Sequence, residues 1–494
     1  MSPTNDHNSF LYANGQVHYG LDTPSVTAST FTGTTTEYDV VVIGAGFAGL
    51  CAARDISRSN KNVLLIEARD RIGGRTYTSP RHGYNVEMGG TWVHWTQPHV
   101  FHEIHQYGLQ GELKRTTGTA SPLAGGPEWV YFPHDGKLER MKNEIYEERI
   151  TRAMKEFFNM DGDVGRVLLE FPHDGSRESI ATKAIEKMSV ADRLAEIKGK
   201  LPDDDIKLMA AFFGSIGCCE VKNISLYDAF KWWSLPGYDV ASLFASTCSF
   251  KLKCGTTKLA QCILSEFQGE TLFNSPVSSI EQSRHLVTLT TRTGVKVSAK
   301  QVVSTVPLNV LHSISFTPPL SPEKLDASKQ GHINKGTKIH MYTDDRIPTF
   351  FTNAPPSSPI LFGFSDDLPP PAGSFSVYFC QSSHLDGKDA TSLAENFTKI
   401  MRSGTMVPGD LVPDEIMCHD WAKDEFARGV WCAFAPGYGG KWGGSLGKRE
   451  GRVWFASGDW ADGWRGFIDG AIEQGCRVAR QVVGEMSDIS TNGV

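Results

Sequence analysis

Near the N-terminal end of the chain, an apolar run stops at three closely spaced glycines and a helical pattern takes over. Residues 38–43 are rich in β-branched side chains, which predicts a buried strand, and the apolar residues from Leu50 to Ile56 predict a helix. A second apolar run at 62–66 predicts another strand and ends on Glu67. The order of strand, glycine turn, helix and strand predicts a βαβ dinucleotide-binding unit.

Each glycine of this G-x-G-x-x-G motif has its own expected role. Gly44 allows the tight turn, Gly46 lets a pyrophosphate approach the backbone, and Gly49 lets the helix pack closely on the strand. Free N–H groups and the positive end of the helix dipole favour a phosphate at this helix start. Glu67 follows about 20 residues after the glycines, where an acid accepts ribose hydroxyls and disfavours a 2′-phosphate. The motif alone leaves NAD and FAD open.

The later pattern divides the chain into helix-rich and strand-rich parts. Amphipathic stretches predict a mostly helical region from about 110 to 250. Around residue 250 the nucleotide-binding domain is expected to resume, with strands at 276–280 and 302–307 and a hairpin about residues 293–294 between them. Alternating residues at 337–342 begin a second strand-rich part.

Composition narrows the class of protein. A chain of 494 residues is too long for one core, so two or more domains are expected. The net charge of -7 and the pI near 6.1 provide no basic face for nucleic acid or an anionic membrane. We find no apolar run as long as a membrane span, no secretory signal and no peroxisomal signal, and we therefore expect a cytoplasmic protein. Whether it forms a homo-oligomer is left open.

The first 36 residues lack apolar periodicity, and Thr23 to Thr36 is rich in Thr and Ser. We expect residues 1–36 to form a flexible arm or an extended segment on the surface. The ten cysteines have no framework spacing and are expected to be reduced thiols. No zinc or catalytic-triad spacing is present, so no metal is expected.

A second glycine turn follows Glu67. The run 67–75 places Gly73 and Gly74 between two arginines, so backbone N–H groups and fixed positive charge are available for a phosphate. This E-A-R-x-R-x-G-G-R run after G-x-G-x-x-G resembles the flavin-dependent amine oxidases, which include monoamine, polyamine and L-amino-acid oxidases. The segment 87–92, E-M-G-G-T-W, is similar to a family segment that passes the isoalloxazine ring.

The resemblance implies an α/β fold, with a Rossmann-like FAD-binding domain of the amine-oxidase (GR2) type and a discontinuous α+β substrate-binding domain. The expected FAD-binding domain comprises 37–115, 250–330 and 440–488, the substrate-binding domain comprises 116–249 and 331–439, and a C-terminal tail covers 489–494. The residues that match the family's FAD contacts are Gly44, Gly46, Phe47, Ala48, Gly49, Glu67, Ala68, Arg69, Gly74, Arg75, Gly90, Thr91, Trp92, Val277, Trp421, Gly458, Asp459, Phe467 and Ile468.

The resemblance also implies three catalytic residues. Trp431 and Phe467 match the two aromatics that stand before the flavin and orient the amine. Lys338 matches by its T-K-I context a lysine that a water links to flavin N5, and Lys335 is its rival. Val430 stands where mitochondrial monoamine oxidases attach FAD through a cysteine, so the FAD is expected to be non-covalent.

The expected substrate pocket is largely apolar, with Phe212, Phe213 and Thr247 as further candidates beside its main set of His94, Trp232, Trp233, Phe244, Trp431 and Phe467. The resemblance implies that the protein deaminates primary amines, aliphatic (long-chain ones included) or arylalkyl, with O2 to a carbonyl, NH3 and H2O2. The alternatives are an L-amino-acid or polyamine oxidase, a flavin-dependent desaturase, and a flavin-bound interaction protein related to the chromatin demethylases.

Overall fold

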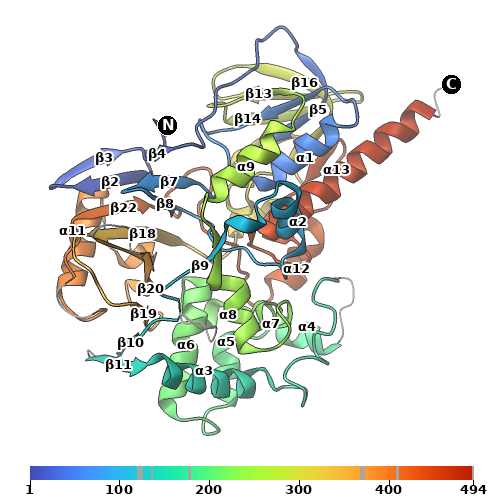
Figure 1. Cartoon of the computed structure of the whole chain (residues 1–494). Helices are drawn as coiled ribbons and strands as arrows, with labels where there is room; N and C mark the ends of the chain where they lie inside the picture. The colour runs from blue at the N-terminus through green and yellow to red at the C-terminus, as the bar shows by residue number, and fades with distance from the viewer. Residues whose placement is uncertain are drawn as a thin grey trace.

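The computed structural model describes residues 1–119, 126–134, 137–175, 180–367, 373–385, 387–407 and 411–491. Two large sheets and a group of helices make up this part of the chain (Figure 1). In the figure the sheet that contains β5 and β16 lies at the top, the sheet that contains β18 and β22 lies at the left, and helices α3 to α8 lie below. The arrangement has the α/β class that the sequence predicts.

The first sheet is built on the predicted βαβ unit. β5 (Glu37–Ile43) pairs in parallel with β6 (Val63–Ile66), and α1 (Phe47–Ser57) connects them. Both strands are largely buried because layers cover both faces of the sheet, so they read as apolar runs. The strand order is β13-β6-β5-β16-β15-β14-β17, with β23 paired to β16. The remaining strands are β13 (Glu270–Leu272), β14 (Val277–Gln282), β15 (Val287–Thr291), β16 (Lys296–Ser304), β17 (Ser315–Thr317) and β23 (Val453–Phe455).

Four helices bury one face of this sheet in a shared apolar core: α1, α2 (Pro98–Gln106), α9 (Thr256–Ser265) and α13 (Ile468–Thr491). The helices α1 and α13 are in direct contact, since a Cβ on Gly475 would lie 2.3 Å from the carbonyl oxygen of Ala48. The other face packs against a second core that includes residues of α10 (Pro322–Gln330) and α12 (Tyr438–Leu446).

The second sheet has the order β11-β10-β19-β20-β21-β18-β22-β2-β3. Its strands are β2 (Ser9–Ala13), β3 (Gln16–Tyr19), β10 (Trp129–His134), β11 (Lys137–Lys142), β18 (Gly336–Thr343), β19 (Phe350–Asn353), β20 (Ile360–Asp367), β21 (Ser374–Gln381) and β22 (Glu415–His419). One side of it packs on α11 (Ala390–Arg402). The other side contributes to the core of the helical group, which comprises α3 (Asn143–Phe158), α4 (Ile180–Glu186), α5 (Val190–Glu196), α6 (Asp203–Gly217), α7 (Leu226–Ser234) and α8 (Val240–Phe244).

Short strands join these layers. β7 (Thr78–Arg81) and β8 (Tyr84–Glu87) form a hairpin, and β9 (Leu113–Arg115) pairs with β12 (Phe250–Leu252). Strands β9, β10 and β11 lie in the region that was expected to be mostly helical. Within the described residues, no helix has both the length and the apolar character that crossing a membrane requires.

Of the two alternatives expected for residues 1–36, the flexible arm is wrong for the first part, which is an extended segment paired with other strands. Strand β2 pairs with β22 of the second sheet, and β1 (Ser2–Pro3) pairs with β4 (Asp22–Thr23). Further along, the N–H of Ile72 donates to the carbonyl of Ser25, and the N–H of Thr30 donates to the carbonyl of Thr271 in the first sheet. These long-range backbone hydrogen bonds hold the segment, and local periodicity carries no sign of them.

The expected C-terminal tail at 489–494 is also shorter than predicted. Helix α13 continues to Thr491, and residues 492–494 lie outside the described part of the chain.

Candidate active site

A cavity runs between the first sheet, the second sheet and helices α6 to α8. It brings together residues that are far apart in the sequence. Of the predicted site residues, these line it: Gly44, Gly46, Phe47, Ala48, Glu67, Ala68, Arg69, Gly74, Arg75, Gly90, Thr91, Trp92, Trp232, Phe244, Val277, Lys338, Trp421, Trp431, Gly458, Phe467 and Ile468.

One end of the cavity is walled by glycines and a helix start. Gly44, Gly46, Gly74 and Gly90 line it, and a Cβ on Gly74 would stand only 3.2 Å from the Cα of Gly46. No side chain caps the N-terminus of α1, and its first turn holds no acid. Unpaired N–H groups and a positive helix end are therefore available here, which fits an anionic pyrophosphate.

The charged residues around this end are already held in place. Glu67 accepts from the N–H of Ala45 at 2.6 Å and from the N–H of Arg69 at 2.9 Å. Arg75 donates to Asp459 at 2.7 Å, and the other oxygen of Asp459 accepts from the N–H of Leu308 at 2.9 Å. Burial opposes the charge of Asp459, but Arg75 and its other partners keep the pKa of this carboxyl below its ordinary value. The ion pair of Arg75 and Asp459 could therefore bind polar groups of a nucleotide cofactor.

Lys338 of β18 lines the same cavity beside the segment Gly89–Thr91 and is only 3% exposed. Its Nζ donates to the carbonyl of Gly89 at 2.9 Å and to Oγ1 of Thr91 at 2.7 Å. Burial lowers the pKa of Lys338 to about 7, so a large share of the side chain is neutral near neutral pH. Its rival Lys335 does not line the cavity and donates instead to the carbonyl of Arg428.

Trp431 and Phe467 lie on backbone segments that touch each other. A Cβ on Gly466 would stand 3.4 Å from the Cβ of Trp431, and both aromatic rings line the same cavity. The indole N–H of Trp431 donates to the carbonyl of Ile216 at 2.7 Å. The ring of Phe467 lies 5.0 Å from that of Trp232. The ring of Phe379 connects Trp431 with Lys338, since it lies 5.8 Å from the ring of Trp431 and 5.1 Å from Nζ of Lys338.

The space beside these rings is apolar, and we call it the aromatic chamber. It is lined by Phe212 and Ile216 of α6, Trp232 of α7, Phe244 of α8, Thr247 and Cys248 of the π-helical turn Ala245–Ser249, and Phe351, Phe362 and Phe379 of the second sheet, together with Thr119, Lys338, Trp431 and Phe467. Among the described residues of this chamber, Cys248 carries a thiol and Lys338 carries the one charged or basic group.

Several predicted residues lie elsewhere. Trp233 belongs to the core, where it stacks on Phe158 at 4.5 Å, because consecutive residues of α7 face different sides of the helix. His94 is buried outside the cavity lining, and its Nδ1 lies 2.8 Å from Oγ1 of Thr96. Phe213, a further candidate, is also a core residue.

Gly49 and Asp459 do not line the cavity but support residues that do. A Cβ on Gly49 would lie 1.8 Å from the carbonyl oxygen of Gly44, so this glycine allows the close contact of helix and strand rather than contact with a ligand. Asp459 reaches the cavity through Arg75.

The aromatic residues of the second sheet were missed. Phe351, Phe362 and Phe379 alternate with other buried residues on strands that are buried on both faces, so alternation does not separate the cavity side from the core side. Thr119 is 2% exposed and also lines the chamber. No sequence signal marks it.

Comparison with known proteins identifies the class that this fold and site define. The flavin containing amine oxidoreductase family matches residues 47–483. The chain is 33% identical to the pseudooxynicotine dehydrogenase of a Pseudomonas species over 463 residues, which cover 92% of this chain and 88% of that protein. It is 30% identical to the nicotine dehydrogenase of Pseudomonas putida over 449 residues, which cover 90% of this chain and 88% of that protein.

The fold is also similar to that of putrescine oxidase bound to putrescine, with a TM-score of 0.74, 19% identity, and coverage of 91% of this chain and 100% of that one. The chain belongs to the flavin containing amine oxidoreductase family. The predicted resemblance and fold class are confirmed: the protein is a flavin-dependent oxidoreductase that acts on small-molecule amines. The individual roles assigned to site residues stay predictions.

Proposed function

We propose that the protein binds FAD non-covalently and oxidises primary monoamines that carry an apolar aliphatic or arylalkyl body. The overall reaction is R-CH(R′)-NH2 + O2 + H2O → carbonyl + NH3 + H2O2. Bound FAD would supply the two-electron oxidation of the amine-bearing carbon. The observation that carries the proposal is the aromatic chamber, which offers apolar and aromatic walls and a single basic group, Lys338, among its described residues.

The chain's own residues prepare the substrate. Trp431 and Phe467 would fix the orientation of the amine between their rings, which reduces the entropy that the reaction must lose. Lys338 is held by Gly89 and Thr91 and can keep an ordered water near the reacting carbon. Because the pKa of Lys338 is about 7, the neutral lysine does not repel an arriving amine above that pH.

The charges of the cavity argue against the nearest alternatives. An amino-acid oxidase needs a cation for the substrate carboxylate, and a polyamine oxidase needs acids for a second ammonium. The other charged groups of the described lining are Glu67, Arg69 and Arg75 beside the nucleotide motifs, and Arg292 and Glu425, which pair with each other at 2.7 Å. None of these belongs to the aromatic chamber. The demethylase-like interaction protein is not favoured, because no family finding points to it.

Non-covalent FAD is supported by the surroundings of Cys432. This thiol is 1% exposed and donates to the carbonyl of Asp459, so it lies outside the cavity lining. Val430, at the position where mitochondrial relatives carry the attached cysteine, cannot form such a bond.

The names of the two bacterial relatives favour the arylalkyl end of this range. Nicotine joins an amine to an aromatic ring, and a chamber walled by Phe and Trp side chains can accept such a body. A secondary or tertiary amine that carries an aromatic ring on a carbon beside the nitrogen is therefore the second candidate substrate class.

An amine panel tests the proposal. Purified holoprotein is mixed with an arylalkyl primary amine, a long-chain alkylamine, nicotine, putrescine and an L-amino acid, and peroxide release is measured beside anaerobic bleaching of the flavin. We expect the apolar monoamines to react and the diamine and the amino acid to fail. Bleaching without peroxide would show that oxygen is not the acceptor, and preference for putrescine or an amino acid would refute the proposed substrate class.

Two tryptophan variants test whether the ring of Trp431 takes part in the reaction. Trp431→Ala should lower kcat/KM at least tenfold while FAD stays bound, whereas Trp454→Ala, another half-buried indole on β23, should react like the wild type. Acid precipitation should release the yellow colour into the supernatant. Colour that remains with the denatured chain would refute non-covalent binding.

A further inference from the structure

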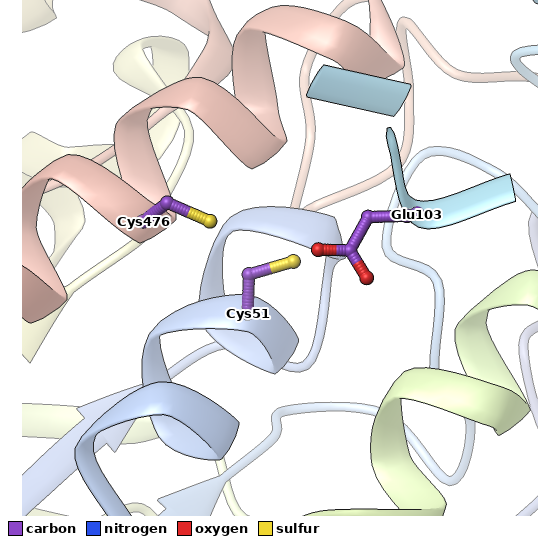
Figure 2. A group of neighbouring side chains, drawn as sticks. All are labelled: Cys51, Glu103 and Cys476. Atoms are coloured by element: carbon purple, nitrogen blue, oxygen red, sulfur yellow. The ribbon is translucent and has the colours of Figure 1, made fainter. Parts of the chain in front are cut away.

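Two cysteines face each other where helices α1 and α13 pack (Figure 2). The Sγ atoms of Cys51 and Cys476 and a carboxylate oxygen of Glu103 all lie within 4.8 Å of one another. Figure 2 shows that Cys476 comes from α13 and directs its sulfur toward Cys51 on α1, with Glu103 of α2 on the far side of Cys51. The mechanism proposed above uses none of these three residues.

The surroundings favour thiol chemistry over a metal site. Both oxygens of Glu103 are taken by Arg54, at 2.5 Å from Nη1 and 2.8 Å from Nη2, so this carboxylate is already neutralised and is not free as a ligand. The two sulfurs are left close to each other, with the sulfur of Cys476 directed toward Cys51 and that of Cys51 turned toward Glu103 (Figure 2). The hydrogen bond to Cys476 and burial both raise the pKa of Cys51 well above its ordinary value, which keeps this thiol protonated.

The two thiols differ in their access to solvent. Cys51 is 0% exposed, whereas Cys476 is half-buried. A small oxidant can therefore reach Cys476 first, and Cys51 is the nearest sulfur to a Cys476 that has been oxidised. The helices already touch through Gly475 and Ala48, and rotation about the Cα–Cβ bonds of the two cysteines is the movement that would bring the sulfurs toward bonding distance.

We propose that Cys51 and Cys476 are an oxidation site at which a peroxide forms a disulfide between α1 and α13. The sulfur of Cys476 attacks one peroxide oxygen and breaks the O–O bond, which gives a sulfenic acid and water. The Cys51 thiol then attacks the sulfenic sulfur, the S–O bond breaks, and the thiol proton leaves with the hydroxyl as a second water. In sum, two thiols and H2O2 become one disulfide and two waters, so the thiols are oxidised and the peroxide is reduced.

The position of the bond gives it a consequence for the cofactor. Phe47 and Ala48 of the first turn of α1 line the cavity, and so do Ile468 and Ala471 of the first turn of α13. A disulfide one turn further along α1 and one to two turns further along α13 ties these two walls together and should slow the release of FAD. Peroxide made by the enzyme itself would be the natural oxidant, and this part rests on the proposed function.

The test counts thiols in the holoprotein. Addition of H2O2, followed by denaturation and thiol titration, should reduce the ten titratable thiols of the chain to eight, with a 51–476 linked peptide in the proteolytic digest. A reducing agent should restore all ten. The linked protein should release FAD several-fold more slowly on dilution. An unchanged thiol count, a different linked pair, or an unchanged release rate would overturn the proposal.

Matched variants and a second source of peroxide complete the test. Cys51→Ser should abolish the link and let Cys476 advance to sulfinic acid, whereas Cys262→Ser, a half-buried cysteine of α9, should still lose two thiols. A link that persists in Cys51→Ser would refute the pairing. Turnover of an active amine should also form the disulfide, and catalase should prevent it. If only added peroxide forms the disulfide, the peroxide-producing function is refuted and the oxidation site is still supported.

Discussion

Replacing Asp6 by asparagine would test whether the N-terminal segment supports the cofactor site. Asp6 is 7% exposed and accepts hydrogen bonds from Nε of Arg69 at 3.2 Å and from Nη2 of Arg71 at 3.3 Å. Arg69 lines the cavity and also donates to Asp424. Burial opposes the charge of Asp6, but His419, Arg69 and Arg71 hold its pKa well below the ordinary value, so the side chain is an anion at neutral pH.

The size of the effect follows from this geometry. Removal of one partner from a buried ion pair costs about 3–5 kcal/mol, because the remaining charge is left without compensation. Here Arg69 keeps Asp424, and Arg71 keeps the carbonyl of Gly74 at 2.8 Å and the face of Tyr77. We therefore expect Asp6→Asn to lower the free energy of unfolding by about 2–3 kcal/mol, which is at or below the low end of that range because both arginines keep other partners. Because Arg69 is then held by one acid, FAD affinity should fall about tenfold, which is about 1.4 kcal/mol.

Chemical denaturation and fluorescence titration of the apoprotein with FAD measure the two effects. Asp70→Asn is the matched control, because Asp70 holds the same segment through Oγ1 of Thr4 and the N–H of Asn5, both at 2.7 Å, without an ion pair to Arg69. The control should lose stability and keep its FAD affinity. Wild-type FAD affinity in Asp6→Asn, or an equal loss in Asp70→Asn, would refute the reasoning.

Three further predictions concern the cavity itself. Gly46→Ala should fold normally, because its Cβ would meet nothing closer than 3.8 Å, yet it should bind FAD poorly. Gly49→Ala should fail to fold, because its Cβ would lie 1.8 Å from the carbonyl oxygen of Gly44. Circular dichroism and FAD titration distinguish these results, and tight FAD binding by Gly46→Ala would contradict the pyrophosphate assignment. The native state releases the proton of Lys338 at a pKa of about 7, whereas the unfolded chain keeps it up to 10.5, so wild-type stability relative to Lys338→Met should rise with pH. The difference in unfolding free energy between wild type and Lys338→Met should rise by about 1.4 kcal/mol per pH unit between about pH 7 and 9. Chemical denaturation at several pH values measures this difference, and a difference that does not change with pH would show that Lys338 stays charged. Asp459→Asn should weaken FAD binding by about 1.5–3 kcal/mol, since the half-buried Arg75 loses its charged partner and keeps only the carbonyl of Val430. Calorimetry that finds wild-type affinity would argue against this role.

The nucleotide half of the site was predictable because its signal is local. A parallel strand buried on both faces, a glycine turn, a helix start and a closing acid occupy consecutive positions between Glu37 and Glu67, and each requires particular residue types. The resemblance of the later motifs then placed Lys338, Trp431 and Phe467 in one site before any contact was known. The structure adds that all three line the same cavity.

The aromatic chamber was less predictable because its walls come from different elements. Trp232 lines the cavity and the adjacent Trp233 lies in the core, a distinction that depends on which face α7 turns toward the sheet. Phe351 and Phe379 come from strands that are buried throughout, so their sequence pattern is the same whichever side they face.

By itself the sequence determined the class of fold and the position of the phosphate-binding turns, because these depend on residues that are neighbours along the chain, and the resemblance of its motifs to a family added the flavin-dependent chemistry. Only the tertiary structure decided that the first residues form a sheet edge that anchors Arg69 and Arg71, which aromatics face the substrate, and that Cys51 meets Cys476. The physical reason is the same in each case. Such contacts join segments separated by tens to hundreds of residues, and local patterns of polarity carry no information on which distant segment will cover them.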